Sequence, residues 1–144
     1  MLIKVKIKKG YWPEERRCKV LDAAKWALEY YNLHLELIPV TELKIIFTRF
    51  DSAYGDAYHD GHYYIVRLSD QYNDKLTIKT VFHEVTHIKQ YFYDGLDLGT
   101  PAKFKGKKYK KTTYENAPWE VEARKAEKKM WGFWKKYIDI SAKC

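Results

Sequence analysis

The sequence has few cysteines and no long apolar run, and each shortage excludes a class of protein. Its two cysteines, Cys18 and Cys144, lie far apart and outside any C-x-x-C or Cys/His cluster. We therefore expect neither a disulfide framework nor a cysteine-type zinc finger. No stretch approaches the roughly 18 to 20 apolar residues that cross a bilayer, and the N-terminal ten residues alternate lysine with apolar side chains. These features predict a cytoplasmic protein with no membrane span and no classical secretion signal.

Acidic residues are also in short supply, with 19 Asp and Glu against 27 Lys and Arg and a formal net charge of +8. Such an excess can attract nucleic acid, anionic lipid or acidic protein, although a solvated lysine surface is the more common explanation. The basic residues gather in two stretches, at residues 4–9 and 103–111. Nucleic acid therefore stays open as a secondary partner.

No internal repeat or low-complexity linker divides the 144 residues, a length that is usual for one domain. The composition, with 46% hydrophobic and 17% aromatic residues, is sufficient for a packed core. We expect one domain over residues 1–144, of unknown oligomeric state.

Two short segments have the composition of strands. Residues 43–48 (LKIIFT) and residues 63–68 (YYIVRL) are rich in β-branched and aromatic side chains. Asp60-Gly61 precedes the second segment and favours a tight hairpin turn. We expect a small mixed sheet with a hairpin at its edge, and we expect the strand over residues 63–68 to be an edge strand.

Three other segments have helical periodicity. Residues 14–32 carry apolar side chains at mostly helical spacing after Pro13 and predict a backing helix. Apolar steps of three and four predict an amphipathic helix that Asp74 caps and Gly95 ends. A last helix begins at Pro118. The predicted order of helix, small sheet, helix, loop and helix is that of an α+β domain.

The chemistry lies in the middle of the second helix, where His83-Glu84-Val85-Thr86-His87 reads H-E-x-x-H. Positions i and i+4 project from nearly the same side of a helix, so both imidazoles can reach one zinc ion at ~2.0 to 2.1 Å. Glu84 is placed to act on water at that ion. This spacing predicts His83 and His87 as metal ligands and Glu84 as a catalytic base.

A catalytic zinc takes three protein ligands, so one more is required. No histidine follows His87, which excludes families that take a downstream third histidine. His34, His59 and His62 lie upstream and are open as ligands, although surface and hairpin positions account for them. Glu120 and Glu122 are the further candidates, and because they lie about 200° apart around a helix, only one can face the metal.

The segment Pro118-Trp119-Glu120-Val121-Glu122-Ala123 carries a resemblance. H-E-x-x-H followed by E-x-x-A on a later helix resembles the gluzincins, and the order of elements is similar to minigluzincins and compact phage and archaeal peptidases. The resemblance covers residues 43–138. It implies a small zincin-like domain, Glu120 as the third zinc ligand, and close helix packing at Ala123.

The resemblance also implies an endopeptidase in which zinc activates water and Glu84 is the general base, with a peptide or protein as substrate. Tyr91, Tyr93 and Tyr114 are candidates to stabilise the developing oxyanion. Two other classes stay open: a catalytically silent zinc-containing binding module, and a basic nucleic-acid-associated protein with a structural zinc. Small gluzincins can be latent, so residues 139–144 are a candidate inhibitory tail in which Cys144 could occupy the open zinc position.

Overall fold

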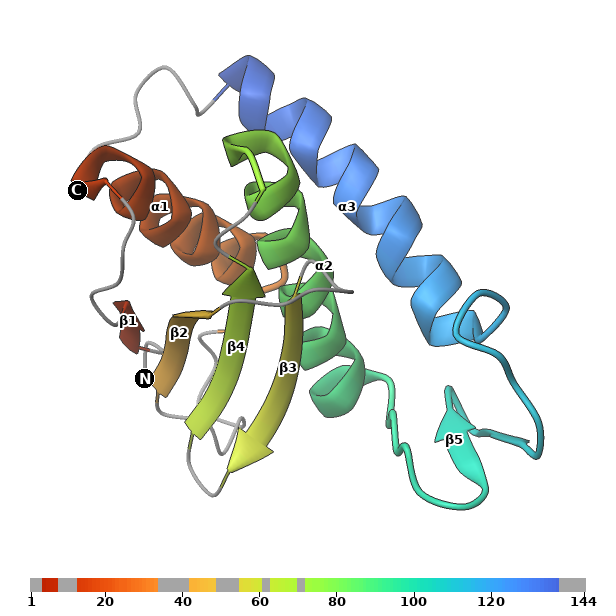
Figure 1. Cartoon of the computed structure of the whole chain (residues 1–144). Coiled ribbons are helices and arrows are strands. Elements are labelled where there is room, and N and C mark those ends of the chain that lie inside the picture. The colour runs from red at the N-terminus through yellow and green to blue at the C-terminus, as the bar shows by residue number, and fades with distance from the viewer. Residues whose placement is uncertain are drawn as a thin grey trace.

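The computed structural model describes residues 4–7, 13–33, 42–48, 55–60, 63–69 and 72–137. These residues form three helices, a four-stranded sheet and a two-stranded sheet (Figure 1). The prediction of a small α+β domain is confirmed. The elements in chain order are β1 (Lys4–Ile7), α1 (Glu14–Tyr30), β2 (Glu42–Thr48), β3 (Gly55–Asp60), β4 (Tyr63–Ser69), α2 (Asp74–Tyr93), β5 (Ala102–Phe104), β6 (Lys107–Tyr109) and α3 (Pro118–Tyr137).

The larger sheet is mixed, with the strand order β1-β2-β4-β3. Strands β1, β2 and β4 are parallel, and β3 pairs antiparallel with β4 in a hairpin whose register joins Asp60 to Tyr63. The sequence-based choice of residues 63–68 as the edge was wrong, because β4 lies between β2 and β3. Three consecutive residues of β4, Tyr64, Ile65 and Val66, are buried, as in strands whose two faces are both covered. The edge beside α2 is β3, whose sequence GDAYHD lacks the β-branched composition of a strand.

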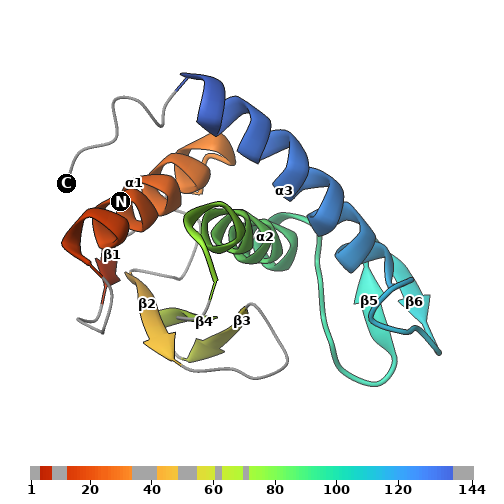
Figure 2. The same cartoon turned by 45° about the horizontal axis from the view of Figure 1, so that its top comes forward.

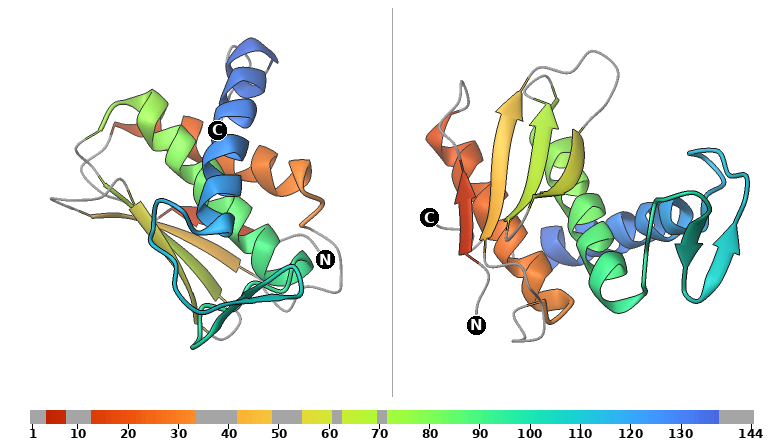
Figure 3. Two further views of the ribbon diagram at one scale, coloured as in Figure 1. Left: turned by 90° about the vertical axis from the view of Figure 1, so that its right-hand side faces the viewer. Right: turned by 90° about the horizontal axis from the view of Figure 1, so that it is seen from below.

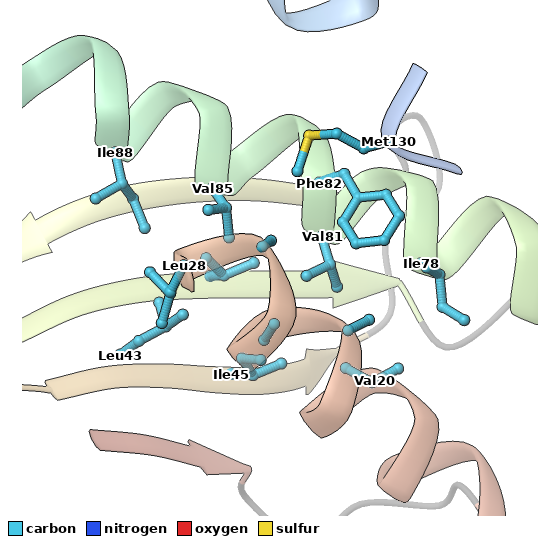
Figure 4. Packing of buried hydrophobic residues seen from close by; sticks show 14 of the residues in the cluster. Val20, Leu28, Leu43, Ile45, Ile78, Val81, Phe82, Val85, Ile88 and Met130 are labelled. Carbon is cyan, nitrogen blue, oxygen red and sulfur yellow. The ribbon is translucent and has the colours of Figure 1, made fainter. Parts of the chain in front are cut away.

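All three helices lie on one side of the larger sheet (Figure 2). Helices α1 and α2 pack against the sheet, and α3 packs on α2. The core between these layers joins Leu43 and Ile45 of β2 to Val81, Val85 and Ile88 of α2 (Figure 4). Each of these side chains is at most 1% exposed, and full burial of such a side chain contributes about 1.5–3 kcal/mol. This core fixes the face that α2 turns away from the sheet.

The ends of α2 are set by local hydrogen bonds. Asn73 is its N-cap, since the Oδ1 atom of Asn73 accepts from the Leu76 amide at 2.9 Å. The prediction of Asp74 as the cap was wrong by one residue; Asp74 instead lies in the first turn and pairs with Arg16. Gly95 follows the helix at φ +66°, a conformation that glycine adopts without steric cost, as predicted.

Helix α3 begins at Pro118, and its first turns cross α2 (Figure 3). A hydrogen-bonded turn leads into it, in which the Thr113 amide donates to Asn116 Oδ1 at 2.7 Å and the Ala117 amide donates to the Thr113 carbonyl at 2.9 Å. Ala123 is fully buried, as the close approach of two helices requires. Farther along, Trp134 packs against Phe82 of α2. The contact between α2 and α3 therefore extends over several turns.

The hairpin β5–β6 was not predicted from the sequence. Its two-residue turn has positive φ at both Lys105 (50°) and Gly106 (80°), the geometry of a tight hairpin turn. Phe104 and Tyr109 pack edge-on against Trp119 of α3, with ring centroids 6.1 and 5.8 Å apart. The hairpin is thereby attached to the first turn of α3 and projects away from the larger sheet (Figure 3).

Three other sequence-based expectations concern membrane-spanning helices, the cysteines and the C-terminal tail. Within the described ranges, no helix is long and apolar enough to cross a membrane. Cys18 on α1 is disulfide-bonded, which the wide spacing of the two cysteines gave no reason to expect. The proposed inhibitory tail, residues 139–144, lies outside the described residues.

Candidate metal centre

Four polar side chains are buried where α2 meets the start of α3. His83, Glu84 and His87 of α2 are 7%, 7% and 9% exposed, and Glu120 of α3 is 9% exposed. The opposite face of α2 packs on the sheet, so the helical period places His83 and His87 on the side of α2 that faces α3. Buried charged groups are rare unless they are paired or bind a metal.

Three of these residues converge on one point. His83 Nε2 lies 2.9 Å from Glu120 Oε2, and His87 Nε2 lies 3.1 Å from Glu120 Oε1. The two Nε2 atoms are 3.1 Å apart. Among the described residues, His83, His87 and Glu120 are the group whose ligand atoms all lie within 4.8 Å of one another. The structure thus brings together the three residues that were predicted as metal ligands.

The arrangement of donor atoms fits a zinc ion. Two nitrogens at ~2.0 to 2.1 Å from a tetrahedral zinc are about 3.3 Å apart, close to the observed 3.1 Å between the imidazoles. Nitrogen and carboxylate oxygen donors in a two-to-one ratio are typical of catalytic zinc. With three protein ligands, a fourth position would face the adjoining pocket.

The second nitrogen of each imidazole has an oxygen partner. His83 Nδ1 lies 3.1 Å from Glu127 Oε1, and His87 Nδ1 lies 2.7 Å from Gln90 Oε1. The side-chain orientation of Gln90 is set by its amide nitrogen, which donates to the Trp119 carbonyl at 2.9 Å. These oxygen partners would hold a proton on each Nδ1 atom when a metal ion is bound, which would leave both Nε2 atoms available as ligands.

Glu127 and Gln90 were not named from the sequence. Their spacing held a signal: Glu127 lies seven residues after Glu120, on the same face of α3, and Gln90 lies three residues after His87. Other polar residues have similar spacings, so the sequence could not identify Glu127 and Gln90 as the partners of the imidazoles. Which polar residue contacts an imidazole depends on how α3 packs on α2.

Glu84 lies beside the three converging groups, in the wall of a pocket of about 170 Å³. Burial raises the pKa of Glu84, and the neighbouring imidazoles lower it in part. Gly55, Asp56 and Ala57 of the edge strand β3 form the opposite wall. The carboxylate of Glu84 is thus positioned between the imidazoles and a space that a ligand can enter.

Glu122, the competing candidate ligand, is directed elsewhere. Its Oε1 atom accepts from Gln90 at 3.1 Å and lies 3.8 Å from Lys89 Nζ, and its Oε2 atom pairs with Lys105 of the hairpin turn. Partial burial raises the pKa of Glu122, but the hydrogen bonds from Lys105 and Gln90 and the positive charges of Lys89 and Lys105 together lower it by more. Glu122 attaches the β5–β6 hairpin to the two helices.

Of the three tyrosines considered from the sequence, two line the pocket and one does not. Tyr91 and Tyr114 are in its wall, whereas the Tyr93 hydroxyl donates to the Asn32 carbonyl at 2.8 Å. Tyr114 is held by Arg124, whose guanidinium donates to the Tyr114 carbonyl at 3.4 Å. Tyr91 and Tyr114 therefore stay as candidates for the oxyanion donor.

A fourth tyrosine, Tyr64 of β4, also lines this pocket and was not considered from the sequence. It is 1% exposed, and its hydroxyl has no hydrogen-bond partner within the described part of the chain. Burial raises its pKa. A buried phenol beside Glu84 offers a hydrogen-bond donor to whatever enters the pocket.

The upstream histidines do not join the cluster within the described residues. His59 is exposed on β3 and stacks on Tyr64 at a centroid distance of 6.1 Å, with the ring of Phe92 also 6.1 Å away. His34 and His62 lie outside the described residues. His59 thus has the role of a surface hairpin residue.

The cluster is tightly coupled electrostatically when no metal is bound. Burial lowers the pKa of His83, but hydrogen bonds with Glu120 and Glu127 raise it by more, to about 9. Burial likewise raises the pKa of Glu120, but the hydrogen bonds to His83 and His87 lower it to about 2. An imidazolium and a carboxylate thus occupy the place of the ligand set, and a metal ion must displace a proton to bind.

Comparison of the chain with protein-family models, with curated proteins and with solved structures found no match.

Proposed function

We propose that this chain is a zinc-dependent endopeptidase in which His83, His87 and Glu120 hold the metal and Glu84 is the general base. One observation supports this most strongly: three donor atoms with the spacing of zinc ligands meet at the wall of a pocket, with the carboxylate of a fourth residue, Glu84, beside them. A purely structural zinc has a closed set of ligands and does not need a base next to it.

The chemistry of the metal would be that of a Lewis acid, which polarises a carbonyl and makes water more acidic. Glu84 would accept the proton of the attacking water as the new C–O bond forms, and would then transfer it to the departing amine as the peptide C–N bond breaks. The raised pKa of the buried Glu84 suits a group that must both accept and return a proton.

The protein around these groups has the expected supporting roles. Glu127 and Gln90 orient the two imidazoles through their Nδ1 atoms. Tyr64, Tyr91 or Tyr114 could donate to the developing oxyanion, since each lines the pocket. A peptide would enter between the edge strand β3 and the face of α2 that carries Glu84.

The first test is of the metal. Native mass spectrometry of the zinc-loaded protein should give one zinc per chain, with zinc lost in Glu120→Ala and retained in Glu122→Ala. The two variants are matched, because each removes one carboxylate from the first turns of α3. Retention of zinc in Glu120→Ala together with its loss in Glu122→Ala would show that the third ligand is wrongly assigned.

The second test is of the chemistry. Glu84→Gln should keep the fold and the zinc but lose about 10² to 10⁴ in the rate of casein or peptide hydrolysis, because glutamine cannot accept the proton. A zinc-replete Glu84→Gln protein with undiminished turnover would remove Glu84 from the mechanism. A wild-type protein with full zinc and no turnover on any peptide library would favour the catalytically silent alternative.

A further inference from the structure

The positive charge of this protein is concentrated in one part of the chain. Residues 98–137 contain 12 Lys and Arg against 4 Asp and Glu, a net charge of +8 that equals the formal net charge of the whole chain. The other residues balance, with 15 basic and 15 acidic side chains. An asymmetry of this kind indicates a surface with an anionic partner more than general solubility.

The first half of this charge lies on the β5–β6 hairpin and the residues after it. Lys103 and Lys108 are directly opposed across the two strands, where like charges destabilise the pairing. Among the described residues, no acidic side chain forms an ion pair with the five exposed lysines of this segment; only Lys105 is neutralised, by Glu122. Those five are Lys103, Lys107, Lys108, Lys110 and Lys111.

The second half lies on the face of α3 that is turned away from α2. Lys125, Lys128, Lys129 and Lys135 are exposed, and they lie on the opposite side of the helix from the buried Met130 and Trp134. They extend over about 15 Å of helix at 1.5 Å per residue. The ring contacts with Trp119 place the hairpin beside the start of α3 (Figure 3).

We propose that these lysines of the hairpin and of α3, together the basic ridge, bind the sugar-phosphate backbone of nucleic acid without reading its sequence. Flexible ammonium groups spread over an extended surface suit regularly spaced phosphates. Arg124, whose side chain could otherwise read a base edge, instead donates to backbone carbonyls of the loop before α3.

The ridge suits nucleic acid better than an acidic protein partner. Protein interfaces depend on buried aromatic or aliphatic anchors at their centre. On the hairpin, Phe104 is 3% exposed and is turned inward against Trp119, so the hairpin presents charge without such an anchor.

The position of the ridge connects it to the pocket without involving the metal centre. Trp119 supports the hairpin on one side and lines the pocket on the other. Nucleic-acid binding does not depend on the proposed peptidase activity, because no lysine of the ridge belongs to the His83, His87 and Glu120 cluster. If the peptidase proposal also holds, its substrates would include proteins carried on nucleic acid.

The test is fluorescence anisotropy of the full-length protein with fluorescein-labelled DNA of about 20 nucleotides, single-stranded and duplex, between about 50 and 200 mM salt. Three variants are compared with wild type. K107Q/K108Q/K110Q/K111Q removes charge from the hairpin, and K125Q/K128Q/K129Q removes it from α3. K4Q/K25Q/K75Q is the matched control, since it removes exposed lysines from the part of the chain that is balanced in charge.

We expect the hairpin variant to bind both DNA probes at least about tenfold more weakly at low salt, with the slope of log K against log salt lower by about 3. The α3 variant should change in the same direction, and the control less than about twofold. Circular dichroism and zinc content should be the same for all four proteins. Equal loss of affinity in the control variant, a wild-type salt slope below about 1, or tighter binding of polyglutamate than of either DNA probe would overturn the proposal.

Discussion

Gln90 is the residue whose replacement tests the metal centre most directly. Its side chain is completely buried, accepts from His87 Nδ1 at 2.7 Å and donates to the Trp119 carbonyl at 2.9 Å. It thus links His87, an expected ligand on α2, to the first turn of α3. The relative position of the two helices must be kept if Glu120 is to contact both imidazoles.

Gln90→Met keeps most of the volume but removes all three hydrogen bonds of the side chain, to His87, to the Trp119 carbonyl and to Glu122. The His87 Nδ1 proton is then buried without a partner, at about 1–3 kcal/mol, whereas the Trp119 carbonyl lies in the first turn of α3 and keeps its hydrogen bond within the helix. The free energy of unfolding should therefore fall by about 1–3 kcal/mol. Loss of an imidazole's oxygen partner usually weakens metal binding about 10- to 100-fold. Both effects follow from one side chain that makes no expected bond to the metal.

Zinc affinity would be measured by competition with a chromophoric chelator, and stability by urea unfolding of the metal-free protein. Thr77→Val is the matched control: Thr77 is also buried on α2, its hydroxyl has no partner within the described residues, and it lies away from the cluster. The control should leave zinc affinity unchanged. A folded Gln90→Met protein that bound zinc as tightly as wild type would refute the reasoning.

Three other outcomes follow from the same geometry. In the metal-free protein, the His83 pKa of about 9 exceeds its ordinary 6.5, so its contribution to stability is complete below pH 6.5 and is lost as the pH rises through about 9. The Glu120 pKa of about 2 lies below its ordinary 4.5, so its contribution to stability is present above pH 4.5 and is lost as the pH falls through about 2. Urea unfolding of the metal-free chain should therefore show maximal stability between pH 4.5 and 6.5. Zinc affinity, measured by calorimetry, should instead rise up to about pH 9. Ala123→Leu, at a fully buried contact of α2 and α3, should cost about 1–3 kcal/mol and weaken zinc binding, and unchanged zinc affinity would show that the helix spacing is not critical. Glu122→Gln should leave zinc bound but speed hydrogen exchange in the β5–β6 hairpin, because its carboxylate is the partner of Lys105; unchanged exchange would mean that the ring contacts with Trp119 alone hold the hairpin.

The sequence was sufficient for the helices because their signals are local. The apolar steps of α2, the proline that opens α3 and the glycine after α2 each act within a few residues, and the three helices lie where they were predicted. The spacing of His83 and His87 within one helix is also local, so their convergence could be predicted without knowledge of the rest of the fold.

The strands were harder because their position depends on partners far away in the sequence. The pattern identified β2 and β4, yet it placed β4 at the edge and did not identify β3, whose residues have little strand propensity and whose pairing with β4 decides its conformation. The same holds for β5 and β6, which are short and contain lysines, so their sequences do not indicate strands.

The choice of Glu120 over Glu122 depends both on the sequence and on the tertiary structure. The sequence restricted the third group to two residues on one helix, since helical geometry prevents both from facing the same point. Only the packing of α3 on α2 determined that Glu120 meets the imidazoles while Glu122 pairs with the hairpin. That packing, and with it the oxygen partners Glu127 and Gln90, depends on side chains from several elements, which no local pattern contains.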